Sequence, residues 1–97
     1  MKRDQIVETL HKNHPKMKER FGVASLSLFG SASRDELRGD SDIDILVSFD
    51  GLATADRYFG LKGYLEDLMG RQVDLATDKM FKPRLRRRVE GEILRVA

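Results

Sequence analysis

The order of apolar and polar residues along the chain predicts alternating helices and strands. Between residues 3 and 20, apolar side chains recur at spacings of three and four, which predicts an amphipathic helix: Ile6, Val7, Leu10 and Met17. Pro15 lies inside that span and predicts a kink or a break near His14, because proline cannot donate a helical hydrogen bond. Gly22 is expected to end the helix.

Three later segments have the pattern of strands. Over 23–29, Leu26 and Leu28 alternate with serines, and Gly30 stops the run. The strongest strand is predicted over 42–49, where one face carries Ile43, Ile45 and Val47. A shorter third strand is expected over 72–76.

Further helices are expected between these strands. Ser31 to Leu37 predicts a short helix, 38–41 a turn, and 54–69 a longer helix whose apolar residues have helical spacing: Tyr58, Leu61, Leu65, Leu68 and Met69. A last helix is expected over about 81–91, and 93–96 is either its end or a short edge strand. The resulting order predicts an α/β (α+β) fold, a sheet with helices packed on it, in one domain over 1–97.

Composition narrows the class of protein. The chain has 97 residues and no cysteine, which excludes disulfides and thiolate metal sites and favours a cytoplasmic location. No apolar run approaches the ~20 residues of a membrane helix, and the first residues lack an apolar signal core. A soluble protein that binds no membrane is therefore expected.

Charge is balanced overall but unevenly placed. The net charge is +2, yet residues 79–88 hold six of the eighteen Lys and Arg, while acidic residues concentrate in 35–56. Such a basic segment is typical of binding to nucleic acid, a polyphosphate or an acidic protein. It is equally typical of a solvated helix face, so both interpretations stay open.

Two aspartates at the start of the strongest strand are the main chemical signal. Asp42 and Asp44 share one strand face because side chains two apart point the same way, roughly 6–7 Å apart at a rise of about 3.3 Å per residue. Carboxylates this close favour a cation, and oxygen ligands suit Mg²⁺ or Mn²⁺. Asp74 lies between apolar residues of the third strand and would join them if the strands are neighbours. Asp40 is better explained as a turn residue.

A Gly-Ser turn precedes the acidic pair. Gly30 has no side chain and lets a phosphate approach the backbone, while Ser31 offers a hydroxyl at a helix start. Arg34, on the next turn, is expected to pair with a phosphate or with one of the carboxylates. The alternative is a plain strand-to-helix turn with a serine cap.

Together these motifs resemble the nucleotidyltransferase superfamily of DNA polymerase β, whose pattern is a Gly-Ser turn, an acidic pair and a third, distant acid. The short chain is similar to the minimal nucleotidyltransferases of bacteria and archaea, which commonly act as antitoxins beside a HEPN-domain ribonuclease. The likeness covers residues 23 to about 76, and residues 82–85 also look familial. It implies a polymerase β palm-like fold with a small mixed sheet.

The resemblance also implies roles for individual residues. Asp42 and Asp44 would coordinate the metal, and Asp74 would help to bind it and accept the proton of an attacking hydroxyl. Gly30 and Ser31 would hold the triphosphate. The implied reaction moves a nucleoside monophosphate from an NTP, expected to be ATP, to a hydroxyl. The implied acceptor is a tyrosine of a HEPN toxin, with which the protein would form a hetero-oligomer.

The sequence is compatible with several alternatives. The first is an antitoxin that neutralises the toxin by binding alone, without transferring a nucleotide. The second is a nucleotidyltransferase that acts on RNA or on a small molecule. Lys82 and Arg84 are expected either to reach the triphosphate or to lie on a wet helix face. His11 and His14 are expected at the surface rather than on a metal. Tyr58 is expected to be a packing residue, as is Tyr64.

Overall fold

The structure is a computed structural model that describes residues 2–33, 42–78 and 93–97. It contains seven elements in those segments: α1 (Arg3–Phe21), β1 (Val23–Leu28), α2 (Gly30–Ser33), β2 (Ile43–Phe49), α3 (Ala55–Met69), β3 (Val73–Thr77) and β4 (Leu94–Arg95). The turn expected over 38–41 and the helix expected over 81–91 lie outside the described residues, as does the second half of the helix expected from Ser31 to Leu37.

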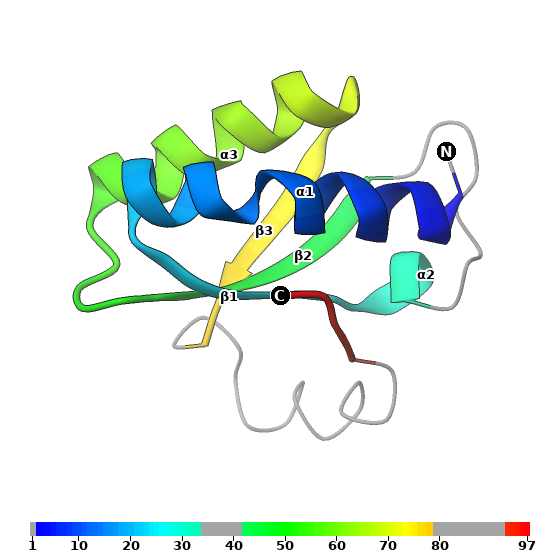
Figure 1. Cartoon of the computed structure of the whole chain (residues 1–97), viewed down its shortest axis with the longest axis horizontal. Helices are drawn as coiled ribbons and strands as arrows, with labels where there is room; N and C mark the ends of the chain where they lie inside the picture. The colour runs from blue at the N-terminus through cyan, green and yellow to red at the C-terminus, as the bar shows by residue number, and fades with distance from the viewer. Residues whose placement is uncertain (1, 34–41, 79–92) are drawn as a thin grey trace.

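One mixed sheet forms the centre of the fold. Its strand order is β3-β2-β1-β4, with β1 antiparallel to both β2 and β4, and β2 parallel to β3. The parallel pair is joined by α3, as a parallel connection requires a crossover. Helices α1 and α3 lie side by side over one face of the sheet (Figure 1). The expected α/β class with a small mixed sheet is therefore confirmed.

A single apolar core lies between the two long helices and the sheet. Apolar residues at helical spacing on α1 and α3 meet alternate residues of β1, β2 and β3, and they bury these side chains: Ile6, Leu10, Met17, Val23, Leu26, Leu28, Ile43, Ile45, Val47, Leu61, Leu65, Met69, Val73 and Leu75. The apolar face of α3 is thus core. The strand residues between these buried positions point to the opposite face of the sheet.

Helix α1 corrects one expectation. A kink or a break was expected near His14. The helix runs without interruption from Arg3 to Phe21 with Pro15 inside it, so the break is wrong. Proline removes one helical hydrogen bond, but Leu10 and Met17 on either side of it are fully buried. Packing against the sheet therefore keeps the helix continuous. Gly22 ends it in the left-handed conformation, with φ of 71°.

The chain end resolves an alternative. Leu94 and Arg95 form β4, which pairs with Leu28 and Ser27 of β1, so residues 93–96 contain a short edge strand.

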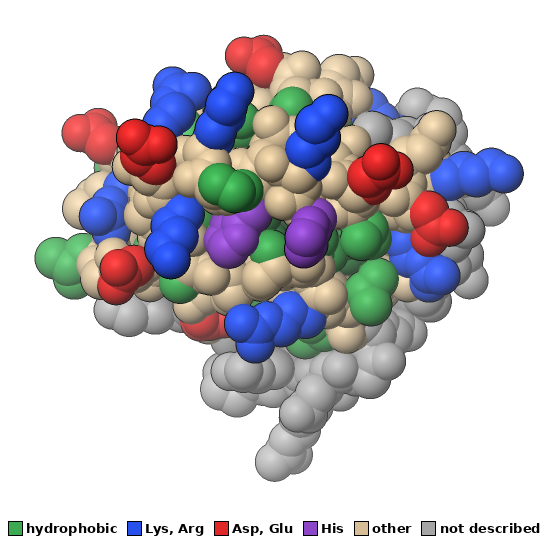
Figure 2. Space-filling model, viewed as in Figure 1, with side chains coloured by type: hydrophobic (Ala, Val, Ile, Leu, Met, Phe, Trp, Pro, Cys, Tyr) green, Lys and Arg blue, Asp and Glu red, His purple; other side chains and the backbone are tan. Residues whose placement is uncertain are grey.

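The side of the molecule in Figure 2 carries Lys and Arg interspersed with Asp and Glu around the histidines, without a block of one sign. In the described part of the chain, no helix is long and apolar enough to cross a bilayer.

Burial makes a prediction about two leucines, one in α3 and one in the loop before it. Leu65 is fully buried in α3, whereas Leu52 is 75% exposed. Leu65→Ala is expected to lower the free energy of unfolding by about 2–5 kcal/mol, because it removes packed atoms and leaves a cavity. Leu52→Ala is expected to change it by less than about 0.5 kcal/mol. Urea denaturation measures both values, and equal losses would contradict this account of the core.

Candidate active site

The predicted acidic pair lies at the start of the central strand β2. Ile43 and Ile45 are fully buried under the helices, so Asp44 between them points to the opposite face of the sheet, where it is half-buried. Asp42 directly precedes the strand and is exposed. The alternation of the strand thus turns Asp42 and Asp44 toward the face that α1 and α3 leave free.

The third predicted carboxylate is a direct neighbour of the second. In the parallel pairing of β2 with β3, Asp44 is the register partner of Asp74, just as Ile43 is of Val73 and Ile45 of Leu75. Partners in neighbouring strands, about 4.8 Å apart, point to the same face. Asp74 is exposed there, while the residues on either side of it are buried.

The Gly-Ser turn lies against Asp44. The N–H of Phe29 donates a hydrogen bond of 3.1 Å to the carbonyl of Asp44, and Gly30 follows with φ of 60°. A Cβ on Gly30 would collide with Oδ2 of Asp44 and lie 3.3 Å from its Cγ. The absent side chain therefore makes room for the Asp44 carboxylate, where the sequence suggested room for a phosphate.

One hydrogen bond closes the short helix α2 on itself, and another joins it to α1. The hydroxyl of Ser33 donates to the carbonyl of Gly30 at 2.8 Å, and Nη1 of Arg3 donates to the carbonyl of Ser33 at 3.0 Å. Ser31 has its backbone in α2. The contribution of Arg3 escaped sequence analysis, because nothing in the pattern links the start of α1 to a turn 30 residues later.

The donor set fits a hard divalent cation. The three aspartates offer only carboxylate oxygens, the ligands that Mg²⁺ and Mn²⁺ prefer. Within residues 2–33, 42–78 and 93–97, however, no group of three or more His, Cys, Asp or Glu side chains is arranged to hold a metal ion. The strands bring the backbones of Asp44 and Asp74 together, and the shared metal site stays a prediction. Arg34, Lys82 and Arg84, predicted to bind phosphates, lie outside the described residues.

The histidines take no part in this arrangement. His11 is exposed, and His14 is half-buried with Nε2 3.3 Å from the carbonyl of Val23, near the end of α1. Both belong to the helix that packs on the opposite face of the sheet from Asp44.

Two hollows lie farther along the strands. One, of about 200 Å³, is formed where β2 and β3 end, by Val47, Ser48, Phe49, Gly51, Ala53, Thr77 and Asp78. The other, of about 280 Å³, lies on the sheet face that carries the aspartates, over Ser25, Ser27, Leu46, Ser48, Asp78, Ile93 and Arg95. Neither includes the three aspartates, although Leu46 is the next residue after Asp44 on the same face.

The chain is similar to known proteins in both sequence and structure. A family model described as the nucleotidyltransferase domain matches residues 11–96. The protein adenylyltransferase MntA of Thermococcus cleftensis is 36% identical over 93 residues, which cover 96% of this chain and 94% of that protein. A solved structure provisionally described as a minimal nucleotidyltransferase has a TM-score of 0.76 at 36% identity, over 91% of this chain and 93% of that one.

The fold is also shared with a more distant protein. In a complex of an MNT antitoxin with a tri-AMPylated HEPN toxin from Shewanella oneidensis, the matching chain has a TM-score of 0.66 at 19% identity. The match covers 94% of this chain and 71% of that one, and at this identity it shows the fold alone. The resemblance inferred from the motifs is confirmed at the level of family and fold. This chain belongs to the nucleotidyltransferase domain family, and MntA matches it over nearly its whole length.

Proposed function

We propose that this protein is a metal-dependent protein adenylyltransferase that moves AMP from ATP to a tyrosine hydroxyl of a HEPN-domain toxin and thereby acts as an antitoxin. One observation carries the proposal: the Asp44 carboxylate lies against the Gly30 turn and has Asp74 as its register partner. The Gly-Ser turn, which we propose binds the triphosphate, lies at the same end of the sheet as these two carboxylates. The name of the 36% identical MntA supports AMP as the transferred group.

The residues have distinct parts in the proposed reaction. The acceptor oxygen forms a bond to the α-phosphorus of ATP while the bond from that phosphorus to the bridging oxygen of the β-phosphate breaks, and pyrophosphate leaves. Asp74 accepts the proton of the attacking hydroxyl. The backbone N–H groups after Gly30 hold the triphosphate, and the hollow beside Leu46 gives room on the same face for the rest of the reactants.

Asp42, Asp44 and Asp74 are the residues that would hold Mg²⁺ or Mn²⁺. The chemistry that the ion supplies when bound is neutralisation of phosphate charge and a lower pKa of the attacking hydroxyl. The toxin partner rests on resemblance, because the relative bound to a HEPN toxin shares only the fold with this chain.

A binding-only antitoxin is the second candidate. It is favoured by two exposed apolar side chains, Phe59 on α3 at 66% exposure and Leu52 in the loop before it at 75%. Exposed aromatic residues of this kind are typical of protein contacts.

The transfer itself is tested with ATP labelled at either end. With Mg²⁺ and a HEPN-domain toxin, label from the α-phosphate is expected on the toxin and label from the γ-phosphate is not, because AMP is transferred. Asp74→Asn is expected to lower the rate by about 10²–10⁴-fold through loss of the base. The control is Asp67→Asn, an exposed carboxylate on α3. Equal rates in the two variants would remove Asp74 from the mechanism.

Removal of the metal gives a second prediction. EDTA is expected to abolish transfer, because the carboxylates alone cannot neutralise the phosphate charge, and added Mg²⁺ or Mn²⁺ is expected to restore it. The double variant Asp42→Asn/Asp44→Asn is expected to lose both transfer and neutralisation of the toxin in growing cells. Full neutralisation by that variant would favour the binding-only candidate.

The contact at Gly30 yields a third prediction with a matched control. Gly30 and Gly70 have nearly the same positive φ, 60° and 66°, but a Cβ on Gly70 would meet nothing within 4 Å. Alanine at either position is expected to cost about 1–2 kcal/mol of unfolding free energy through backbone strain. Only Gly30→Ala displaces the Asp44 carboxylate, so only it is expected to lower the transfer rate, by about 10²-fold. Comparable rates for the two variants would show that the contact is irrelevant to chemistry.

A further inference from the structure

Strand β3, which carries Asp74, lies at the edge of the sheet. It pairs with β2 on one side, and among residues 2–33, 42–78 and 93–97 no strand pairs with its other side. Backbone N–H and C=O groups on that outer side therefore make no hydrogen bonds to another strand that the structure describes. Edge strands with such groups fray or shift register more readily than central ones, and a shift of one residue would turn Asp74 toward the core.

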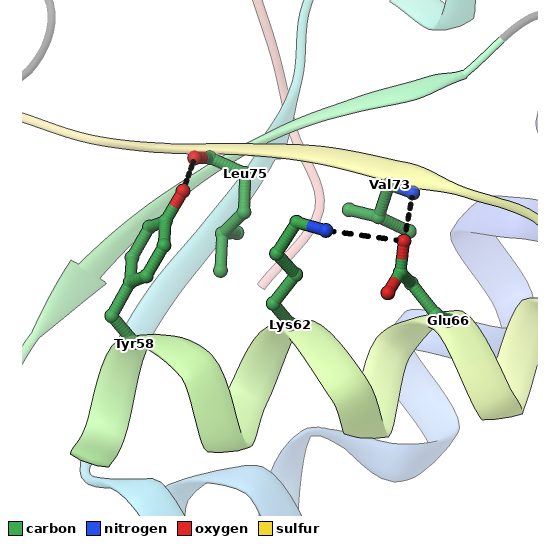
Figure 3. A network of polar contacts seen from close by, with 5 residues as sticks. All are labelled: Tyr58, Lys62, Glu66, Val73 and Leu75. Carbon is green, nitrogen blue, oxygen red and sulfur yellow. Dashed lines mark hydrogen bonds and ion pairs between the residues drawn. The ribbon is translucent and has the colours of Figure 1, made fainter. Parts of the chain in front are cut away.

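Helix α3 satisfies two of these groups with side chains. The N–H of Val73 donates a hydrogen bond of 3.1 Å to Oε2 of Glu66, and the hydroxyl of Tyr58 donates one of 2.6 Å to the carbonyl of Leu75. Figure 3 shows both side chains reaching from α3 to the strand. Val73 and Leu75 are the residues immediately before and after Asp74, so the two hydrogen bonds flank the position of Asp74.

The helix face that makes these contacts is continuous. Tyr58, Lys62 and Glu66 are four residues apart, which places them in one row along α3. Nζ of Lys62 lies 3.3 Å from the same Oε2 of Glu66, and thereby orients the carboxylate toward the strand. The neighbouring row, Leu61, Leu65 and Met69, packs in the core and fixes the helix itself.

We propose that Tyr58 and Glu66 are positioning residues that hold Asp74 in register beside Asp44. The inference rests on the function proposed above, in which Asp74 takes the proton of the acceptor. Asp74 itself is exposed, so its position depends on the backbone of β3 rather than on packing of its own side chain. Two hydrogen bonds, one on each side, fix that backbone from the edge that the sheet leaves open.

The electrostatics of Glu66 agree with this role. The N–H of Val73, and after it Lys62, hold the pKa of the Glu66 carboxyl below its ordinary value. Because folding lowers this pKa, the contact contributes stability at neutral pH and loses it as the pH falls through the lowered value. At neutral pH Glu66 therefore accepts the strand N–H as a carboxylate, which gives a charge-assisted hydrogen bond.

The experiment compares two tyrosines of the same helix. Tyr58→Phe removes the hydrogen bond to β3, whereas Tyr64→Phe removes a hydroxyl that faces Asn13 of α1 at 3.5 Å. With ATP, Mg²⁺ and the toxin, Tyr58→Phe is expected to lower kcat about 10- to 100-fold, because a misplaced base slows the chemical step. KM for ATP is expected to stay unchanged, since the Gly30 turn is untouched. Equal kcat values for the two variants would overturn the proposal.

Glu66 provides a rescue test. Glu66→Ala is expected to lower kcat as Tyr58→Phe does, while Glu66→Gln keeps an oxygen that accepts the Val73 N–H and is expected to recover most of the rate. A Glu66→Gln variant as slow as Glu66→Ala would contradict the positioning role.

Amide hydrogen exchange tests whether Tyr58 holds β3 in place, and this measurement does not depend on enzymatic activity. Exchange across β3 is expected to be about 2- to 10-fold faster in Tyr58→Phe than in Tyr64→Phe, because one hydrogen bond to the strand is lost. Unchanged exchange would overturn the proposal. A wild-type protein that transfers no AMP would instead remove the proposed function, and the exchange result would still decide whether Tyr58 holds the strand.

Discussion

The parallel pairing of β2 with β3 is the constraint on which the rest of this structure depends. It sets Asp44 beside Asp74 and, by the same alternation, sets Ile43 and Ile45 beside Val73 and Leu75 in the core. The site and the core are therefore two faces of one register. A shift of register that separated Asp44 from Asp74 would also expose apolar side chains. Burial on one face of the sheet therefore stabilises the arrangement of carboxylates on the other.

Helix α3 links these two roles. As the crossover of the parallel pair it must pack on the sheet, and Leu61 and Leu65 do so from inside the core. Its next row of side chains reaches the open edge of β3 and satisfies backbone groups around Asp74. A helix whose sequence pattern indicates only packing thus also supports β3 on the side where no other described strand pairs with it.

The turn at Gly30 shows how closely the two halves of the site fit. The sequence pattern suggested that glycine leaves room for a phosphate, and the space it leaves is filled by the carboxylate of Asp44. The turn and the acidic strand are therefore mutually constrained: a side chain on one would move the other. The hydroxyl of Ser33 closes the short helix α2 on Gly30, and Arg3 joins this helix to α1. Residues far apart along the chain thus share one small region at the end of the sheet.

Local sequence was sufficient to place the two long helices and the first three strands, and to set Asp44 on the face opposite Ile43 and Ile45, because strand alternation is a property of the backbone. The sequence was also sufficient to identify the family motif, a Gly-Ser turn followed by an acidic pair. Sequence could not decide that α1 continues through Pro15, since that depends on packing of Leu10 and Met17 against the sheet. Nor could it assign Tyr58 more than a packing role. Three contacts join segments that are distant in sequence: the pairing of Asp44 with Asp74, the contact of Asp44 with Gly30, and the hydrogen bonds from Tyr58 and Glu66 to β3. Only the tertiary structure decides which distant segments meet.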